Sequence, residues 1–217
     1  MKKKGVIFDM DGLLFDTERI FQKAWIREAE LRGFKADPGF QVKAMGVNGE
    51  DLLSLIEETY PGIDAGDYLE KTVARVREMV KEELPEKPGI HEILPWLKEQ
   101  RIRIGLASAS SPESIHSHLS RSGILQYFDA VVSSRQVPRG KPAPDVFLEA
   151  ARQIGLRPED CYVLEDGING IRGALAAGCS AIMIPDLAEP LPEFYSQCAA
   201  ILPSLQEALR LMQEGRL

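Results

Sequence analysis

Val6-Ile-Phe-Asp-Met-Asp-Gly12 decides the fold of this chain. Its first three residues are apolar and belong to the run 5–8, which predicts a short buried strand. Two carboxylates, Asp9 and Asp11, directly follow that strand. Similar apolar runs with β-branched residues recur at residues 102–107, 130–132, 161–164 and 181–184. Helical patterns lie between them, at residues 91–99, 112–122, 144–154 and 167–177. This alternation predicts an α/β fold with a doubly wound, mostly parallel sheet and helices on both sides.

Residues 17–87 break the alternation, because helical patterns at 18–32, 48–60 and 67–83 follow one another without a convincing strand. Asp16-Thr17-Glu18 is typical of a helix start with a capping residue. Leu84-Pro-Glu-Lys-Pro-Gly89 is a stretch that no helix would cross. The interval therefore predicts an inserted helical bundle. Residues 1–16 and 88–217 would form the α/β core, and residues 17–87 a helical cap.

The composition excludes several classes of partner. The 217 residues carry a formal net charge of −7, so no basic stripe is left for nucleic acid. No apolar run is long enough to span a bilayer, so no membrane partner is expected. Cys161, Cys179 and Cys198 are odd in number and widely spaced, which favours reduced thiols and predicts a cytoplasmic protein. A monomer is the default expectation, since the sequence contains no legible heptad seam.

Polar side chains follow the predicted strands at the point where each strand ends. Asp9 and Asp11 follow the first strand, Ser108-Ala-Ser110 the second and Glu165-Asp166 the fourth, while Gly140-Lys-Pro142 lies in the loop after the third. Ligand sites of open parallel sheets form beyond the carboxyl ends of the strands, so these side chains are expected to converge. Four carboxylates so close together would repel one another unless a cation lies among them. Oxygen ligands without His or Cys, at a site that also holds phosphate, favour Mg²⁺.

The same residues suggest a reaction. Asp9 is the natural nucleophile, because a carboxylate can form an acyl phosphate that water later opens. Asp11 is placed to protonate the leaving oxygen and then to deprotonate the attacking water. Lys141 and Ser108 would supply a positive charge and a hydroxyl donor to the phosphoryl oxygens.

Four stretches of the chain resemble the ordered motifs of the haloacid dehalogenase-like hydrolase superfamily. They are Asp9-Met-Asp-Gly-Leu-Leu-Phe-Asp-Thr-Glu18, Leu106-Ala-Ser-Ala-Ser110, Gly140-Lys-Pro-Ala-Pro-Asp145 and Leu164-Glu-Asp-Gly-Ile-Asn-Gly170. Single motifs of this kind arise by chance, but four in order, each at a strand end, are specific. The resemblance spans nearly the whole chain and is greatest to the branch with a helical cap, which includes β-phosphoglucomutase and small phosphomonoester phosphatases.

The resemblance implies a Rossmann-like core and a role for each motif residue. It implies that Asp9 is the nucleophile and Asp11 the acid/base, and that Ser108, Ala109 and Lys141 bind the phosphoryl group. Mg²⁺ would be held by the Asp9 side chain, the Asp11 backbone carbonyl, Asp166 and, directly or through water, Glu165. The dehalogenases of the family lack an acid at the position of Asp11, so its presence favours phosphate over halide as the group transferred.

Cap residues separate a phosphatase from a mutase, and we name Glu18, Phe21 and Gly49 as candidates for substrate contact. β-Phosphoglucomutase carries a histidine at the position of Phe21 and a phosphate-gripping arginine at that of Gly49. Without that arginine a bisphosphate intermediate loses a charged contact on the order of 1.5–3 kcal/mol, which favours hydrolysis. The spacing of Phe21, Trp25 and Ala29 also fits simple packing inside the cap.

The expected function is Mg²⁺-dependent hydrolysis of a small phosphorylated metabolite, such as a sugar phosphate, a nucleotide-like compound or a phosphoglycolate-type acid. Two alternatives stay open. One is a mutase resembling β-phosphoglucomutase, and the other is a non-catalytic phosphate-binding or interaction protein on the same fold.

Overall fold

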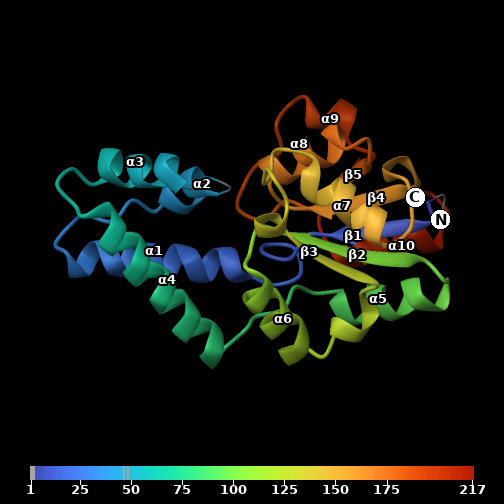
Figure 1. Cartoon of the computed structure of the whole chain (residues 1–217), viewed down its shortest axis with the longest axis horizontal. Helices are drawn as coiled ribbons and strands as arrows, with labels where there is room; N and C mark the ends of the chain where they lie inside the picture. Colours follow the sequence, from blue (N-terminus) through green and yellow to red (C-terminus); the bar gives the residue numbers. More distant parts are fainter. Residues whose placement is uncertain (1–2, 46, 48) are drawn as a thin grey trace. The chain divides into compact units, whose positions relative to one another are not determined.

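A six-stranded sheet forms the centre of the larger part of the molecule (Figure 1). The computed structural model describes residues 3–45, 47 and 49–217. The strands are β1 (Gly5–Phe8), β2 (Arg103–Ser108), β3 (Ala130–Ser133), β4 (Cys161–Glu165), β5 (Ser180–Met183) and β6 (Ala200–Ile201). Their order is β3-β2-β1-β4-β5-β6, and each neighbouring pair is parallel. The doubly wound parallel α/β fold is therefore confirmed.

Helices cover both faces of this sheet (Figure 1). One face carries α7 (Asp145–Gln153), α8 (Ile168–Ala176) and α9 (Phe194–Gln197), and the other carries α5 (Ile90–Glu99), α6 (Pro112–Arg121) and α10 (Leu205–Gln213). Short 3₁₀ turns lie at Leu125–Tyr127, Ser134–Gln136 and Pro158–Asp160. Successive strand side chains point to opposite faces: Ile7 packs with Phe147 of α7, whereas Val6 and Phe8 are buried on the other face. Because both faces are buried, the interior residues of the longer strands are apolar, and polar residues stand at the strand ends.

The position of β1 determines where a ligand site can form. Phe8 lies opposite Leu106 of β2 on one side and opposite Leu164 of β4 on the other. The chain winds from β1 to β2 and β3 in one direction and then from β4 to β6 in the other, so the strand order reverses between β1 and β4. Parallel sheets open a crevice at the carboxyl ends of the strands where the order reverses. Asp9 stands directly at that point.

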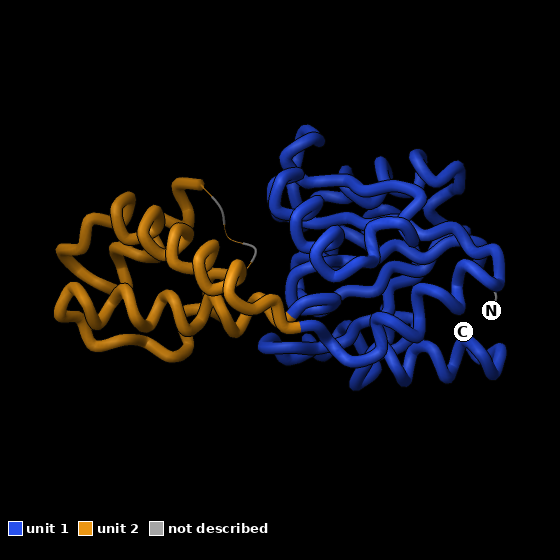
Figure 2. Tube along the Cα trace, turned by 90° about the horizontal axis from the view of Figure 1, so that it is seen from below, with its two compact units in different colours: residues 1–15, 86–217 blue, residues 16–85 orange. Residues whose placement is uncertain are grey.

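A second compact unit comprises residues 16–85 (Figure 2). It contains α1 (Thr17–Leu31), α2 (Phe40–Ala44), α3 (Gly49–Thr59) and α4 (Ala65–Glu82). Four aromatic rings form its centre, with neighbouring centroids 5.0 to 5.7 Å apart: Trp25, Phe40, Tyr60 and Tyr68. The Tyr68 hydroxyl donates a hydrogen bond of 2.8 Å to the Trp25 carbonyl, so its polar end is satisfied inside this core.

The boundaries of this unit differ from the expected residues 17–87 by one to two residues. Phe15 pairs with Glu86 in an antiparallel bridge, and Lys87 N–H donates to the Leu14 carbonyl at 2.8 Å, so residues 86 and 87 belong to the α/β unit. Asp16 N–H donates to the Pro85 carbonyl at 2.9 Å in the helical unit. Asp16 stands at the N-cap of α1, but its side chain does not cap the helix, because it accepts a hydrogen bond from Arg19 instead.

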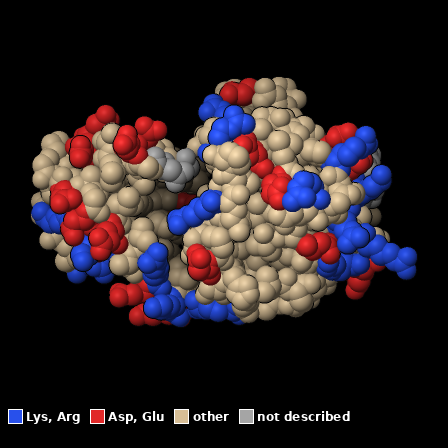
Figure 3. Space-filling view, in the orientation of Figure 1, with Lys and Arg blue, Asp and Glu red and all other residues tan. Residues whose placement is uncertain are grey.

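Several short elements were not expected from the sequence: α2, α9, α10 and β6. Cys161, Cys179 and Cys198 are free thiols, and the first two are buried. Across the described part of the chain, no helix combines the length and the apolar character needed to span a membrane. On the face drawn in Figure 3, basic and acidic side chains are interspersed.

Candidate active site

Asp9 follows β1 and lies at the centre of the site. Its backbone N–H donates to the Leu164 carbonyl at 3.0 Å, which continues the β1–β4 ladder by one residue and fixes the direction of its side chain. The side chain is 8% exposed. Burial raises the pKa of Asp9 well above its ordinary range; Lys141 opposes this shift, and the nearby charges of Glu165 and Asp11 add to it. A divalent cation beside Asp9, in addition to Lys141, would favour the charged form of its carboxyl group.

Lys141 comes from the loop before α7 and donates to three acceptors. Its Nζ lies 2.5 Å from Asp9 Oδ1, 2.7 Å from Glu165 Oε1 and 2.9 Å from the Ala107 carbonyl. Burial by itself would lower the pKa of Lys141, but the two carboxylates outweigh it and raise that pKa. Lys141 is therefore charged, and it joins the ends of β1, β2 and β4 through one ammonium group.

Asp9, Glu165 and Asp166 form a buried acidic group. Each offers one carboxylate oxygen, and these oxygens lie within 4.8 Å of one another. Gly167 N–H donates to Glu165 Oε2 at 2.9 Å and fixes that carboxylate. Gly170 of α8 makes room for it, because a Cβ at position 170 would lie 1.7 Å from Glu165 Oε1. The three oxygen ligands fit a hard divalent cation, whose charge would offset the repulsion that Lys141 alone balances only in part.

Asp11 belongs to the loop after β1, and its side chain engages two serines of the loop after β2. Ser110 Oγ donates to Asp11 Oδ2 at 2.7 Å, and Ser108 Oγ lies 3.4 Å from the same oxygen. His118 is also near: burial lowers the pKa of its imidazole, although the Asp11 charge opposes that shift. His118 is therefore neutral at pH 7 and supplies no positive charge to Asp11.

The structure brings most of the expected residues to one edge of the sheet. Asp9, Asp11, Ser108, Lys141, Glu165 and Asp166 are linked there by the contacts above. Ala109 is exposed in the loop between Ser108 and Ser110. The sequence patterns predict no role for Ser110 or Gly170, although both lie inside the second and fourth motifs. The available signal is their spacing, two residues after Ser108 and five residues after Glu165.

The three cap candidates belong to the helical unit. Glu18, in the first turn of α1, accepts a hydrogen bond from the buried Gln41 side chain. Phe21 is half-buried and packs against two apolar clusters of this unit, the one around the aromatic rings and a second one of Ile20, Ala24, Val76 and Val80. Trp25 and Ala29 are buried, as the packing interpretation predicts. Gly49 is exposed at the first residue of α3 with φ of +61°, a conformation that favours glycine.

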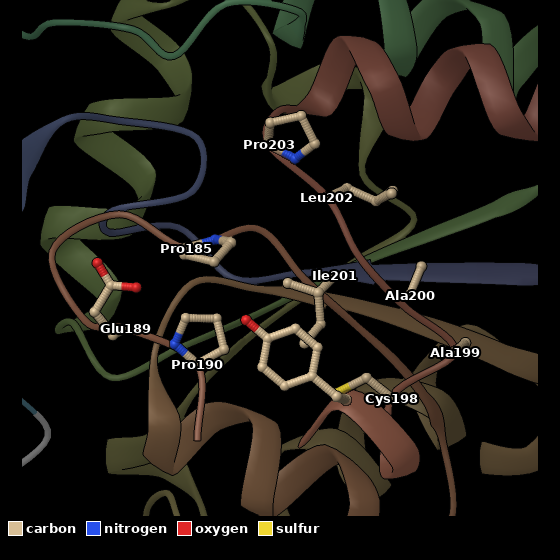
Figure 4. Close-up of a pocket in the computed structure, with 10 residues that line it drawn as sticks. Pro185, Glu189, Pro190, Cys198, Ala199, Ala200, Ile201, Leu202 and Pro203 are labelled. Carbon is tan, nitrogen blue, oxygen red and sulfur yellow. The ribbon is translucent and has the colours of Figure 1, made fainter. Parts of the chain in front are cut away.

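A separate groove of about 680 Å³ lies beside the edge strand β6 (Figure 4). Its walls are formed by Pro185, Pro190, Tyr195, Cys198, Ile201 and Leu202, with Glu189 as its charged residue. It contains neither the acidic group nor Lys141. The groove is therefore distinct from the site at Asp9.

Comparisons with known proteins agree with the fold and the motifs. Residues 6–184 match the family model described as haloacid dehalogenase-like hydrolase. The chain belongs to the haloacid dehalogenase-like hydrolase family. The resemblance that the four motifs indicated is therefore confirmed.

Two curated relatives and one solved structure illustrate this membership. The chain is 34% identical to a phosphorylated carbohydrates phosphatase of Thermotoga maritima, over 82% of this chain and 83% of that protein. It is 32% identical to a beta-phosphoglucomutase of Bacillus subtilis, over 82% of each chain. It also superposes on a HAD family hydrolase of Deinococcus radiodurans with bound phosphate and sodium, with a TM-score of 0.79, 25% identity and coverage of 100% and 98% of the two chains.

Proposed function

We propose that this protein hydrolyses a small phosphorylated sugar or related phosphomonoester, with Mg²⁺ as cofactor and Asp9 as the nucleophile. The observation that carries the proposal is the placement of the Asp9 carboxylate between the Lys141 ammonium group, at 2.5 Å, and the acidic group completed by Glu165 and Asp166. A nucleophilic carboxylate that lies beside both a fixed cation and a metal-ligand set is what phosphoryl transfer to a protein side chain requires.

The reaction has two steps. A carboxylate oxygen of Asp9 attacks phosphorus, the bond from phosphorus to the leaving oxygen breaks, and Asp11 gives its proton to that oxygen. Water then attacks the phosphorus of the aspartyl phosphate, Asp11 takes the proton from the water, and inorganic phosphate leaves while Asp9 is regenerated. Lys141, Ser108 and the Ala109 N–H would bind the phosphoryl oxygens. Asp9, Glu165, Asp166 and the Asp11 carbonyl would hold Mg²⁺, which supplies positive charge to the transferring group.

The substrate class rests on the relatives. A phosphatase of phosphorylated carbohydrates is among them, which supports a sugar phosphate over the nucleotide-like and phosphoglycolate-type compounds. The helical unit, residues 16–85, would select the leaving group, with Glu18, Phe21 and Gly49 as the candidate contacts.

A phosphomutase is the second candidate, because a beta-phosphoglucomutase is also a relative, at 32% identity. Phe21 and Gly49 weaken it, since a neutral ring and an exposed glycine cannot grip a second phosphate as a charged side chain does. The non-catalytic alternative has no observation in its favour beyond the fold itself.

Phosphate release from a panel of phosphomonoesters tests the proposal. The panel contains p-nitrophenyl phosphate, fructose 1-phosphate, glucose 6-phosphate, glycerol 3-phosphate and phosphoglycolate, each with Mg²⁺. Activity is expected on sugar phosphates, with loss on adding EDTA and in Asp9→Asn. Asp160→Asn is the matched control, because Asp160 is a carboxylate outside the site that pairs with Arg157. No release from any member would contradict the proposal, and isomerisation of β-glucose 1-phosphate to glucose 6-phosphate would favour the mutase.

A further inference from the structure

Asp11 is held by a serine that the reaction scheme leaves without a role. Ser110 Oγ lies 2.7 Å from Asp11 Oδ2, whereas Ser108 Oγ lies 3.4 Å from that oxygen. A serine hydroxyl has one hydrogen to donate. At 2.7 Å Ser110 commits its hydrogen to Asp11, while the longer contact of Ser108 is weak. The two hydroxyls of the same loop therefore have different tasks: Ser108 can donate to a phosphoryl oxygen, and Ser110 fixes the carboxyl group.

Both backbone polar groups of Ser110 are hydrogen-bonded. Its N–H donates to Ser108 Oγ at 3.0 Å, and its carbonyl accepts a hydrogen bond of 2.6 Å from Ser133 Oγ. Ser133 is fully buried at the end of β3, opposite Ser108 in the strand register. The loop after β2 is thereby tied to the next strand of the sheet.

Ser133 is in turn fixed by the 3₁₀ turn that follows it. Its N–H donates to Gln136 Oε1 at 3.1 Å, and its Oγ accepts from Arg135 N–H at 3.2 Å. Because a carbonyl oxygen can only accept, the single hydroxyl hydrogen of Ser133 points to the Ser110 carbonyl. A continuous chain of hydrogen bonds thus runs from a rigid strand end to the carboxyl group of Asp11.

We propose that Ser110 and Ser133 are positioning residues that orient Asp11 for proton transfer to the leaving oxygen. The proposal rests on the proposed function, in which Asp11 is the acid. A general acid accelerates its step only when it lies within hydrogen-bond reach of the reacting oxygen. Loss of either hydroxyl releases the carboxyl group from that direction without removing it.

The dependence of rate on the leaving group separates positioning of the acid from a structural effect. An alkoxide leaving group needs a proton, whereas p-nitrophenolate is a weak base and leaves without one. Ser110→Ala is expected to lower kcat on the best sugar phosphate of the panel by roughly 10- to 100-fold, and on p-nitrophenyl phosphate by less than about 3-fold. KM is expected to change little on either substrate. Ser133→Ala should show the same pattern more weakly.

Two variants serve as controls. Ser134→Ala removes a neighbouring hydroxyl that is buried and has no hydrogen-bond partner among the described residues, so both rates should stay at the wild-type level. Ser110→Thr keeps the hydroxyl, so its kcat on the sugar phosphate should return towards the wild-type value. Equal losses on both substrates in Ser110→Ala, or no loss on either, would overturn the inference.

A crystal structure of Ser110→Ala tests the inference independently of turnover. The Asp11 carboxyl group is expected to adopt another rotamer or to become disordered; an unchanged orientation would refute the positioning role even if the wild-type protein proved inactive. Absence of activity in the wild type would instead count against the proposed function, so the two failures are distinguishable.

Discussion

At the scale of single residues, Lys141 limits how phosphate can enter the site. An ammonium group has three hydrogens, and Lys141 directs them to Asp9, Glu165 and the Ala107 carbonyl. A phosphoryl oxygen that binds Lys141 therefore replaces one of these acceptors. Glu165 is the natural one to yield, because its carboxylate also belongs to the acidic group. Phosphate binding and cation binding are thus expected to support each other.

Lys141→Met tests this role. We expect kcat to fall on the order of 10²- to 10³-fold, because the charge that stabilises the transferring phosphoryl group is lost. Lys98→Met is the control, since Lys98 forms a comparable 2.7 Å pair with Asp129 away from the site and should leave turnover unchanged. Steady-state kinetics at saturating Mg²⁺ provide the measurement, and a small loss in Lys141→Met would contradict the assignment.

Gly170→Ala tests the room that α8 leaves for Glu165. A Cβ there would lie 1.7 Å from Glu165 Oε1 and 1.9 Å from its Cδ, so the buried carboxylate must move away from Lys141. Displacement of a metal-binding carboxylate is expected to cost roughly 10- to 100-fold in activity or metal affinity. Gly66→Ala is the matched helical control: its Cβ would meet Asp64 Oδ1 at 3.4 Å, and activity should be retained. Equal activity of the two variants would show that Glu165 is not held as described.

The sequence locates the main residues of the site but not their hydrogen bonds. Asp9, Ser108 and Glu165 stand at or directly after strand ends, so the parallel fold alone brings them together. The bond from Ser110 to Asp11 depends on a rotamer and on a loop conformation, and neither leaves a periodic trace in sequence. Gly49 and Phe21 stay predictions, because helical periodicity does not tell which face meets a substrate.

At the scale of elements, the strands with continuous apolar runs are predictable and the marginal ones are not. β1 and β4 are buried along their whole length, so hydrophobicity marks them clearly. β6 has two half-buried residues, Ala200 and Ile201, at the edge of the sheet, too few to form a pattern. α2 has five residues and ends before a full apolar stripe can repeat.

The contact between α1 and α4 contains a buried ion network that sequence patterns do not reveal. Glu28 of α1 is 4% exposed and accepts hydrogen bonds from Arg32, at 2.5 Å, and Arg75 of α4, at 2.6 Å. Burial alone would raise the pKa of Glu28, but the two guanidinium groups outweigh it and lower that pKa below the ordinary value. The charged carboxylate therefore stabilises the helical unit.

Glu28→Gln is expected to lower the free energy of unfolding by about 1–3 kcal/mol at pH 7, since it removes charge-assisted hydrogen bonds. Because the folded-state pKa is lowered, the stabilisation is present above the unfolded-state pKa and is lost as the pH falls through the folded-state pKa. The difference between wild type and variant should therefore shrink as the pH falls below the ordinary glutamate pKa of 4.5. Urea unfolding across this range measures it. Glu30→Gln, at an exposed ion pair, should show almost no difference at any pH, and a constant difference for Glu28→Gln would contradict the linkage.

At the scale of the whole molecule, the acidic group links the stability of the α/β unit to cations. In the folded state Asp9 lies beside Glu165 and Asp166 and their carboxylates repel one another, whereas in the unfolded chain Asp9 is far from that adjacent pair. A cation that binds only the folded form stabilises it by mass action. Stability of this unit is therefore expected to depend on the concentration of Mg²⁺.

Addition of Mg²⁺ at about 100 times its dissociation constant should stabilise the fold by about 2.7 kcal/mol, which corresponds to a Tm increase of roughly 5–10 °C. Asp166→Asn should lose most of this increase, because it removes one ligand of the acidic group. Asp160→Asn should keep it. Differential scanning calorimetry at constant ionic strength measures the shift without reference to activity. An equal shift in Asp166→Asn and wild type would show that the cation binds elsewhere.

The bridge between Phe15 and Glu86, where the chain passes from one unit to the other, has an evolutionary consequence. At the first and last residues of the helical unit, the Asp16 N–H donates to the Pro85 carbonyl. Directly outside it, Phe15 and Glu86 of the α/β unit form an antiparallel bridge. A tight turn of two residues can close such a bridge directly. We therefore expect that the helical unit can change in length or sequence without a shift in the register of β1 against β2. Under the proposed role of this unit in selecting the leaving group, we expect substrate preference to change with exchanges at this junction while the residues at the sheet edge stay in place.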